Sequence, residues 1–244
     1  MNIRLVVLDM AGTTVRDDDS VNTSLRDALA AVAVVSREEV NAVMGLPKPM
    51  AIRKLLELHQ GGRVSVSEQT VASVHADFLA RMLRFYRTEP NVEPMPHTLE
   101  AFDQLKAAGV RLALDTGFSR PIMDAILARL GWKNSPLLDA TVASDEVGHG
   151  RPQPDLIFKA MELTGVNDPK AVAKVGDTPS DLLEGRAAGC GLVIGVTNGT
   201  HTREELAPHP HTNLIVSLRE LPPLVLAHDS AAARPPSPAI RHEP

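Results

Sequence analysis

The residues best able to do chemistry each follow a short apolar run. Asp9 ends the run Val6-Val7-Leu8, and the turn sequence Met-Ala-Gly-Thr-Thr comes next. A lone aspartate at such a position often only caps a turn. Farther along, Asp177 and Asp181 lie four residues apart and share one face if their segment is helical. Two neighbouring carboxylates are costly unless a cation neutralises them, and hard oxygen ligands favour Mg²⁺.

Two further motifs could bind phosphate. Thr116-Gly117 follows another apolar run, and a short hydroxyl beside a backbone N–H can hold a phosphoryl oxygen. Arg151 begins the sequence Arg-Pro-x-Pro after the turn Gly148-His149-Gly150. A guanidinium offsets the negative charge spread over phosphoryl oxygens. The residue types therefore indicate phosphoryl chemistry that combines carboxylates, a hydroxyl, a guanidinium and a metal ion.

The elements that must position these residues alternate along the chain. Short apolar runs typical of strands cover 4–8, 111–114, 140–143, 171–175, 192–196 and 214–216. Helical patterns cover 97–108, 119–130, 155–164 and 179–188. This alternation predicts an α/β fold with a Rossmann-like parallel sheet, whose ligands bind at the carboxyl ends of the strands. We expect Asp9, Thr116 and Asp177 at that edge.

The segment 18–89 breaks the alternation and is predicted to be wholly helical. A periodic pattern covers 23–34, Ser36 and Glu39 form a capping-box signature, a third helix covers 49–59, and Ser65 with Glu68 opens a fourth. Such an insert predicts a helical cap domain over 18–89 and a core domain made of 1–17 and 90–226. The proline-rich residues 227–244 are predicted to form a disordered tail.

The composition of the 244 residues excludes several classes of protein. Lys and Arg number 25 against 30 Asp and Glu, so no basic surplus points to nucleic acid or to an anionic membrane. No run approaches the roughly 18 apolar residues that a membrane-spanning helix needs. Cys190 is the single cysteine, which rules out an internal disulfide and fits a reducing compartment. We therefore expect a cytoplasmic globular protein whose partner is a small molecule.

The order of the four motifs resembles the haloacid dehalogenase superfamily over about residues 3–225. The resemblance implies a Rossmann-like core with a cap inserted after the first motif. It implies that Asp9 is a nucleophile that forms an aspartyl-phosphate, and that Thr116, Gly117 and Arg151 bind the phosphoryl group. It implies that Mg²⁺ is held by Asp9, by the backbone carbonyl of Ala11 and by Asp177, with support from Asp181 directly or through water.

The residue at position 11 departs from the common pattern of that superfamily. Most phosphatases of the superfamily carry a second aspartate two residues after the nucleophile, and that aspartate protonates the leaving alkoxide. In this chain the corresponding residue is Ala11. Such an acid typically contributes ~10²–10⁴-fold to the rate. Either the leaving group needs no acid, or another group supplies it, such as His149 or the substrate itself.

One branch of the superfamily, the phosphonatase-like hydrolases, resembles this chain in the alanine, in the motif Gly-Arg-Pro-x-Pro around Arg151, and in Met44-Gly-Leu-Pro-Lys48. The resemblance implies that Lys48 forms a Schiff base with an aldehyde, so that a P–C bond breaks without an alkoxide. Two other roles stay open for Lys48, binding of a substrate anion and a solvated position at a helix start. Met44 could contact substrate from the cap. Ala51 and Phe118 replace a histidine and a tyrosine of that branch.

Three functions follow from these residues. The first is an Mg²⁺-dependent hydrolase of phosphonatase type, acting on phosphonoacetaldehyde or a related phosphonate. The second is a phosphomonoester phosphatase, of phosphoglycolate or sugar-phosphate type, or a phosphomutase. The third is a binding module without catalysis, which the complete set of motifs disfavours. Because related enzymes pair through their caps, the resemblance also implies a homodimer.

Overall fold

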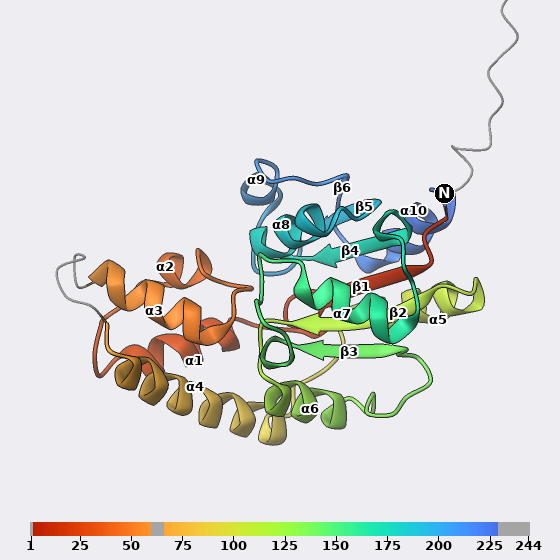
Figure 1. Ribbon diagram of the computed structural model, residues 1–244. Coiled ribbons are helices and arrows are strands. Elements are labelled where there is room, and N and C mark those ends of the chain that lie inside the picture. The colour runs from red at the N-terminus through yellow and green to blue at the C-terminus, as the bar shows by residue number, and fades with distance from the viewer. Residues whose placement is uncertain (1, 60–65, 229–244) are drawn as a thin grey trace, which may run out of the picture.

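A six-stranded parallel sheet forms the centre of the part of the chain that the computed structural model describes, residues 2–59 and 66–228 (Figure 1). Its order is β3-β2-β1-β4-β5-β6, which is the doubly wound Rossmann order. The strands are β1 (Leu5–Asp9), β2 (Arg111–Thr116), β3 (Ala140–Ala143), β4 (Val172–Gly176), β5 (Leu192–Val196) and β6 (Asn213–Ile215). The predicted fold class is confirmed, and every predicted strand is present, with ends that differ by two residues at most.

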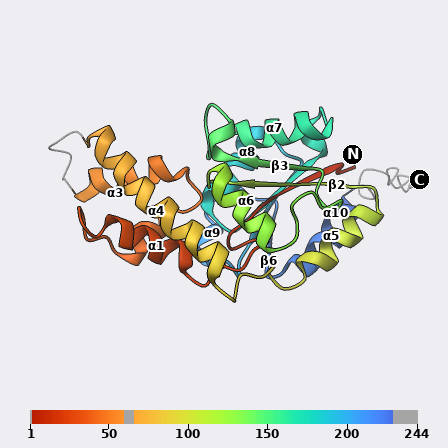
Figure 2. The same ribbon diagram turned by 90° about the horizontal axis from the view of Figure 1, so that it is seen from below.

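Helices cover both faces of the sheet (Figure 2). The core helices are α5 (Thr98–Ala107), α6 (Arg120–Arg129), α7 (Asp155–Thr164), α8 (Pro179–Ala188), α9 (Arg203–Leu206) and α10 (Leu221–Ala227). Alternation along β1 explains the two layers, because successive side chains of a strand point to opposite faces. Leu5 and Val7 pack with the buried residues of α7 and α8, whereas Val6 and Leu8 pack with those of α5, α6 and α10.

Four helices, α1 (Ser20–Leu29), α2 (Arg37–Asn41), α3 (Lys48–His59) and α4 (Glu68–Thr88), are inserted between β1 and the rest of the core. They pack on one another beside the carboxyl ends of the strands, and the long α4 also lies along α6 (Figures 1 and 2). The predicted helical insertion is therefore confirmed. Among the described residues, none of the helices is both long and apolar enough to cross a membrane.

Three details of the cap and tail differ from the sequence prediction. The first cap helix ends at Leu29 rather than at 34, because Leu29 is its last fully buried residue and Val32 and Val34 beyond it are exposed, Val34 by 87%. The fourth cap helix has Ser67 as its N-cap, accepting from the backbone N–H of Thr70; the predicted Ser65 lies outside the described residues. Ala227, predicted to start the tail, is the last residue of α10, and residues 229–244 lie outside the described part.

Candidate active site

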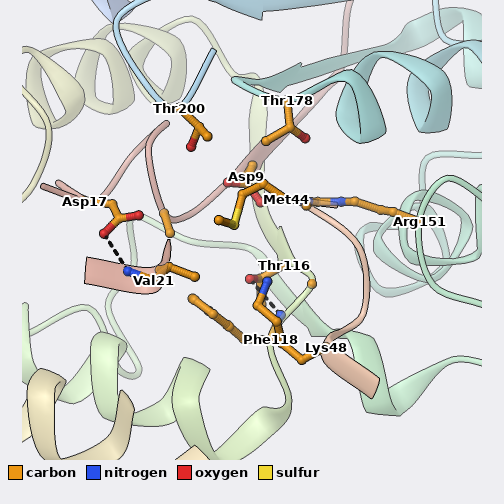
Figure 3. A pocket seen from close by; sticks show the side chains of 13 residues that line it. Asp9, Asp17, Val21, Met44, Lys48, Thr116, Phe118, Arg151, Thr178 and Thr200 are labelled. Carbon is orange, nitrogen blue, oxygen red and sulfur yellow. Dashed lines mark hydrogen bonds and ion pairs between the residues drawn. The ribbon is translucent and has the colours of Figure 1, made fainter. Parts of the chain in front are cut away.

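The carboxyl ends of three neighbouring strands bring the predicted residues together. Asp9 is the last residue of β1 and Thr116 the last of β2, while Asp177 directly follows β4. Because β1 pairs with both β2 and β4 in parallel register, these three positions fall on one edge of the sheet. The predicted position of Asp9, Thr116 and Asp177 at this edge is confirmed. Figure 3 shows that Arg151 and the cap residues Met44 and Lys48 point toward the same place.

The Asp9 carboxylate lies against the Arg151 guanidinium. Nη1 of Arg151 donates to Oδ1 of Asp9 at 2.6 Å, while its Nε donates to Glu184 at 3.0 Å and its Nη2 to Asp115 at 2.5 Å. All these side chains are buried. Burial raises the pKa of Asp9 to about 8, and the Arg151 charge opposes that shift. The ionised, nucleophilic form of Asp9 therefore depends on positive charge at the site.

A group of buried carboxylates next to Asp9 can hold a metal ion. Oxygens of Asp9, Asp177 and Asp181 lie within 4.8 Å of one another. Asp177 accepts a hydrogen bond from Thr13 Oγ1 at 3.0 Å and one from the backbone N–H of Thr200 at 2.6 Å, so its orientation is fixed. Burial, followed by the Asp181 charge, raises the pKa of Asp177 to about 6. Buried oxygen donors of one sign of charge suit a divalent cation.

A second carboxylate cluster, made of Asp115, Asp181 and Glu184, already contains a cation of the protein itself. Nζ of Lys174 lies 2.5 Å from Asp115, 3.2 Å from Asp181 and 3.0 Å from Glu184. Lys174 is fully buried in β4, and these carboxylates hold its pKa above the ordinary value although burial opposes them. Asp181 belongs to both clusters and pairs with Lys174 and Arg151, whereas Asp177 pairs with no lysine or arginine of the described residues, so the cluster of Asp9, Asp177 and Asp181 is the metal candidate.

Lys48 is the first residue of α3 and enters the site from the cap. Its side chain is 4% exposed, and its Nζ lies 5.2 Å from the ring centre of Phe118 and 5.9 Å from that of Phe78. No hydrogen bond or ion pair of the described residues engages this Nζ. Burial lowers the pKa of Lys48 to about 8. An amine in such surroundings is far more often unprotonated at neutral pH than an exposed lysine is.

Asp9, Lys48 and Arg151 line one pocket (Figure 3). It is lined by Asp9, Ala11, Asp17, Val21, Met44, Gly45, Lys48, Thr116, Gly117, Phe118, Arg151, Thr178 and Thr200. The space open to the centre of a water-sized sphere is only about 20 Å³, enough for one or two waters.

Glycines form the seam between cap and core. A Cβ on Gly117 would lie 2.6 Å from the carbonyl oxygen of Gly45 and 2.9 Å from that of Leu46, and a Cβ on Gly150 would overlap the ring of Pro47. Gly45 itself has φ +81° and lies against Thr178. The cap loop that carries Met44 and Lys48 therefore touches the core backbone directly, which only residues without a side chain permit.

Some residues considered from the sequence lie elsewhere. His149 is 78% exposed at its side chain, bonds to Asp155 at 3.2 Å and does not line the pocket. Ala51 is fully buried within α3 and does not line it either. Sequence reasoning missed Asp17, which does line the pocket, and the role of Lys174. A lysine within the apolar strand Val-Ala-Lys-Val-Gly was the available signal for Lys174.

Comparison with known proteins agrees with this arrangement of a Rossmann-like core, an inserted cap and carboxylates at the strand ends. These features define a hydrolase of the α/β class with a buried acidic centre. Residues 3–189 match the haloacid dehalogenase-like hydrolase family, and the chain belongs to that family.

Among its relatives is the phosphonoacetaldehyde hydrolase of Lysinibacillus sphaericus, 32% identical over 220 residues that cover 84% of this chain and 80% of the relative. A crystal structure of a phosphonoacetaldehyde hydrolase-like protein from Oleispira antarctica has a TM-score of 0.81 at 20% identity, covering 98% of this chain and 96% of that one. A putative phosphoglycolate phosphatase from Lactobacillus delbrueckii has a TM-score of 0.76 at 18% identity, covering 93% and 99%. The two structural matches show the fold.

Proposed function

We propose that this hydrolase is an Mg²⁺-dependent phosphonatase that cleaves the P–C bond of phosphonoacetaldehyde, or of a related aldehyde phosphonate, and releases phosphate. The observation that carries the proposal is Lys48, a buried amine without an ion-pair partner that lines the same pocket as Asp9. A pKa near 8 leaves part of this amine unprotonated at neutral pH, as attack on an aldehyde requires. The phosphonoacetaldehyde hydrolases that are about 30% identical to this chain support the same substrate class.

Two nucleophiles act in sequence in this proposal. The unprotonated Lys48 amine adds to the aldehyde carbon, and uptake of one proton with loss of water gives an iminium ion. The Asp9 carboxylate then attacks phosphorus; the P–O bond forms, the P–C bond breaks, and its electron pair moves into the iminium to give an enamine. No alkoxide leaves, so this step requires no acid at Ala11. A proton then adds to the enamine carbon, and water hydrolyses both the phosphoryl-aspartate and the resulting iminium.

The remaining pocket residues bind charge. The Thr116 hydroxyl, the Gly117 backbone N–H and the Arg151 guanidinium are suited to the phosphoryl oxygens. Mg²⁺ would be held by Asp9, by the backbone carbonyl of Ala11 and by Asp177, with Asp181 in support, and would offset the repulsion between the Asp9 carboxylate and the phosphonate. Met44 is suited to contact the substrate's carbon chain.

Closure of the cap belongs to the same proposal. We take residues 18–89 as a cap domain that opens to admit substrate and closes to bring Lys48 toward Asp9 on the core of 1–17 and 90–226. Closing excludes water from the imine and the phosphoryl-aspartate, which would otherwise hydrolyse early.

The test is acetaldehyde release from phosphonoacetaldehyde with Mg²⁺, followed by a coupled alcohol dehydrogenase. Asp9→Asn and an EDTA-treated sample are expected to release none. Borohydride added during turnover is expected to reduce the imine and fix the two-carbon unit on Lys48, identified by peptide mass. Release of acetaldehyde by Lys48→Ala at the wild-type rate would contradict the assignment.

Phosphate-ester hydrolysis is the second candidate. One observation favours it, because Ala51 and Phe118 are apolar where the phosphonatase-like branch carries polar groups near the aldehyde. An ester would leave as an alkoxide, which needs a proton. Phosphate release from phosphoglycolate or sugar phosphates, unaffected by borohydride and unaccompanied by any acetaldehyde release from phosphonoacetaldehyde, would support this candidate instead.

A further inference from the structure

We propose that Asp17 is a further catalytic residue, the acid that protonates the fragment leaving phosphorus. The titratable residues that line the pocket, within the described chain, are Asp9, Asp17, Lys48 and Arg151. Asp9 bonds to phosphorus, Lys48 bonds to the aldehyde carbon, and the buried guanidinium keeps its charge. Threonine hydroxyls are too weakly acidic for this role. Asp17 is therefore the one lining group left that can give a proton.

The carboxylate of Asp17 is held so that one oxygen faces the pocket. Its Oδ1 accepts hydrogen bonds from the backbone N–H groups of Ser20 at 2.8 Å and Val21 at 3.1 Å. Its Oδ2 has no hydrogen-bond or ion-pair partner among the described residues. Figure 3 shows this second oxygen turned away from the start of α1 and toward the pocket centre. The first oxygen thus fixes the side chain, and the second is free to exchange a proton.

The electrostatic surroundings suit an acid. Burial raises the pKa of Asp17 to about 6, while the Val21 and Ser20 N–H groups oppose the shift. Asp17 and Lys48 lie close enough that the carboxylate raises the pKa of the amine. Asp17 also borders an outer hollow with Arg16 and Asp18, and part of its surface is exposed, so water can restore its proton.

The proton transfer from Asp17 rests on the proposed function, and its atoms and charges balance as follows. After P–C cleavage, the enamine carbon takes the proton of the Asp17 carboxyl, and the enamine becomes the iminium of acetaldehyde on Lys48. Water then releases acetaldehyde and the amine. Asp17, now a carboxylate, takes back one of the protons set free when water cleaves the imine and the phosphoryl-aspartate. For an ester substrate the same carboxyl would protonate the leaving alkoxide.

A purely structural role would also explain the two hydrogen bonds, because they cap the start of α1. Asp17→Asn separates the two roles, since its amide oxygen can still accept from Ser20 and Val21 but its side chain cannot act as an acid. Asp18→Asn is the matched control, because Asp18 carries the same charge next to Asp17 and lies outside the reaction pocket. Asp17→Ala removes both roles.

The experiment compares two substrates. Phosphonoacetaldehyde needs a proton on its leaving carbon, whereas acetyl phosphate releases acetate without one. We expect Asp17→Asn to lower kcat on phosphonoacetaldehyde by about 10²–10⁴-fold and to change kcat on acetyl phosphate by less than roughly threefold. Asp18→Asn is expected to change neither. Equal losses on both substrates, or no loss on either, would overturn the assignment.

The same variants give a different kinetic result if the proposed function is wrong. If the wild type releases no acetaldehyde, P–C cleavage is wrong, and phosphoglycolate replaces phosphonoacetaldehyde as the substrate whose leaving group needs a proton. Asp17→Asn must then slow phosphoglycolate hydrolysis selectively, relative to acetyl phosphate. A wild-type enzyme that turns over acetyl phosphate alone has no working acid, which also overturns the role of Asp17.

Discussion

Substitution of Gly117 by alanine tests whether the cap must touch the core for the reaction to occur. The new Cβ would lie 2.6 Å from the carbonyl oxygen of Gly45 and 2.9 Å from that of Leu46, against ordinary contacts of 3.4–4 Å. Both neighbours are backbone atoms, so no side chain can rotate away and the cap loop must retreat by roughly 1 Å. Lys48 lies two residues beyond Leu46 and must retreat with it.

A misplacement of about 1 Å can cost about 10²-fold in rate, or roughly 2.7 kcal/mol of transition-state stabilisation. We therefore expect kcat/KM of Gly117→Ala to fall by about 10²-fold. The fold itself should persist, because an open cap relieves the clash and Gly117 has no positive φ.

The assay measures acetaldehyde release, borohydride trapping at Lys48 and thermal unfolding on the same samples. Gly148→Ala is the matched control, because its Cβ would approach nothing nearer than Asp155 at 3.8 Å and its φ is also not positive. A Gly117→Ala enzyme with kcat/KM within twofold of wild type would refute the seam argument.

Three further predictions follow from the buried charges. Because burial lowers the pKa of Lys48 from 10.5 to about 8, the folded state pays the full cost of a buried ammonium below pH 8, and that cost disappears as pH rises toward 10.5. Lys48→Met should therefore stabilise the protein at pH 7 by about 1–3 kcal/mol, and urea titrations should show the gain vanishing above pH 10. Lys174→Met removes one of the two buried cations that pair with Asp115 and Glu184, with Arg151 as their remaining partner, and should cost roughly 3–5 kcal/mol in the same titrations; a loss under 1 kcal/mol would contradict the ion cluster. EDTA should abolish activity and lower Tm, and Mg²⁺ should restore both, while Asp177→Asn should make Tm insensitive to the metal.

Local patterns were sufficient to predict the core of the fold. The strands and core helices follow from apolar runs, caps and glycines, and these are properties of neighbours in the sequence. The helical ends at Gly165 and Gly189 are examples, since both glycines take the left-handed conformation that closes a helix. The first cap helix was predicted too long because Val32 and Val34 look like core residues, although no other element covers them.

The sequence alone determined the chemistry that this chain can carry, because side-chain types and their order at strand ends are visible in it. Asp9, Thr116, Arg151 and the pair Asp177 and Asp181 were all identified in this way.

Only the tertiary structure decided how those groups are charged and which of them can meet. Lys174 fills the second acidic cluster, Lys48 is buried at the pocket with no ion-pair partner among the described residues, and Asp17 turns one oxygen into the pocket. These facts depend on contacts between residues far apart in the chain and on the burial that the closed cap imposes. Burial and distant charges set a pKa, and neither is a property of adjacent residues.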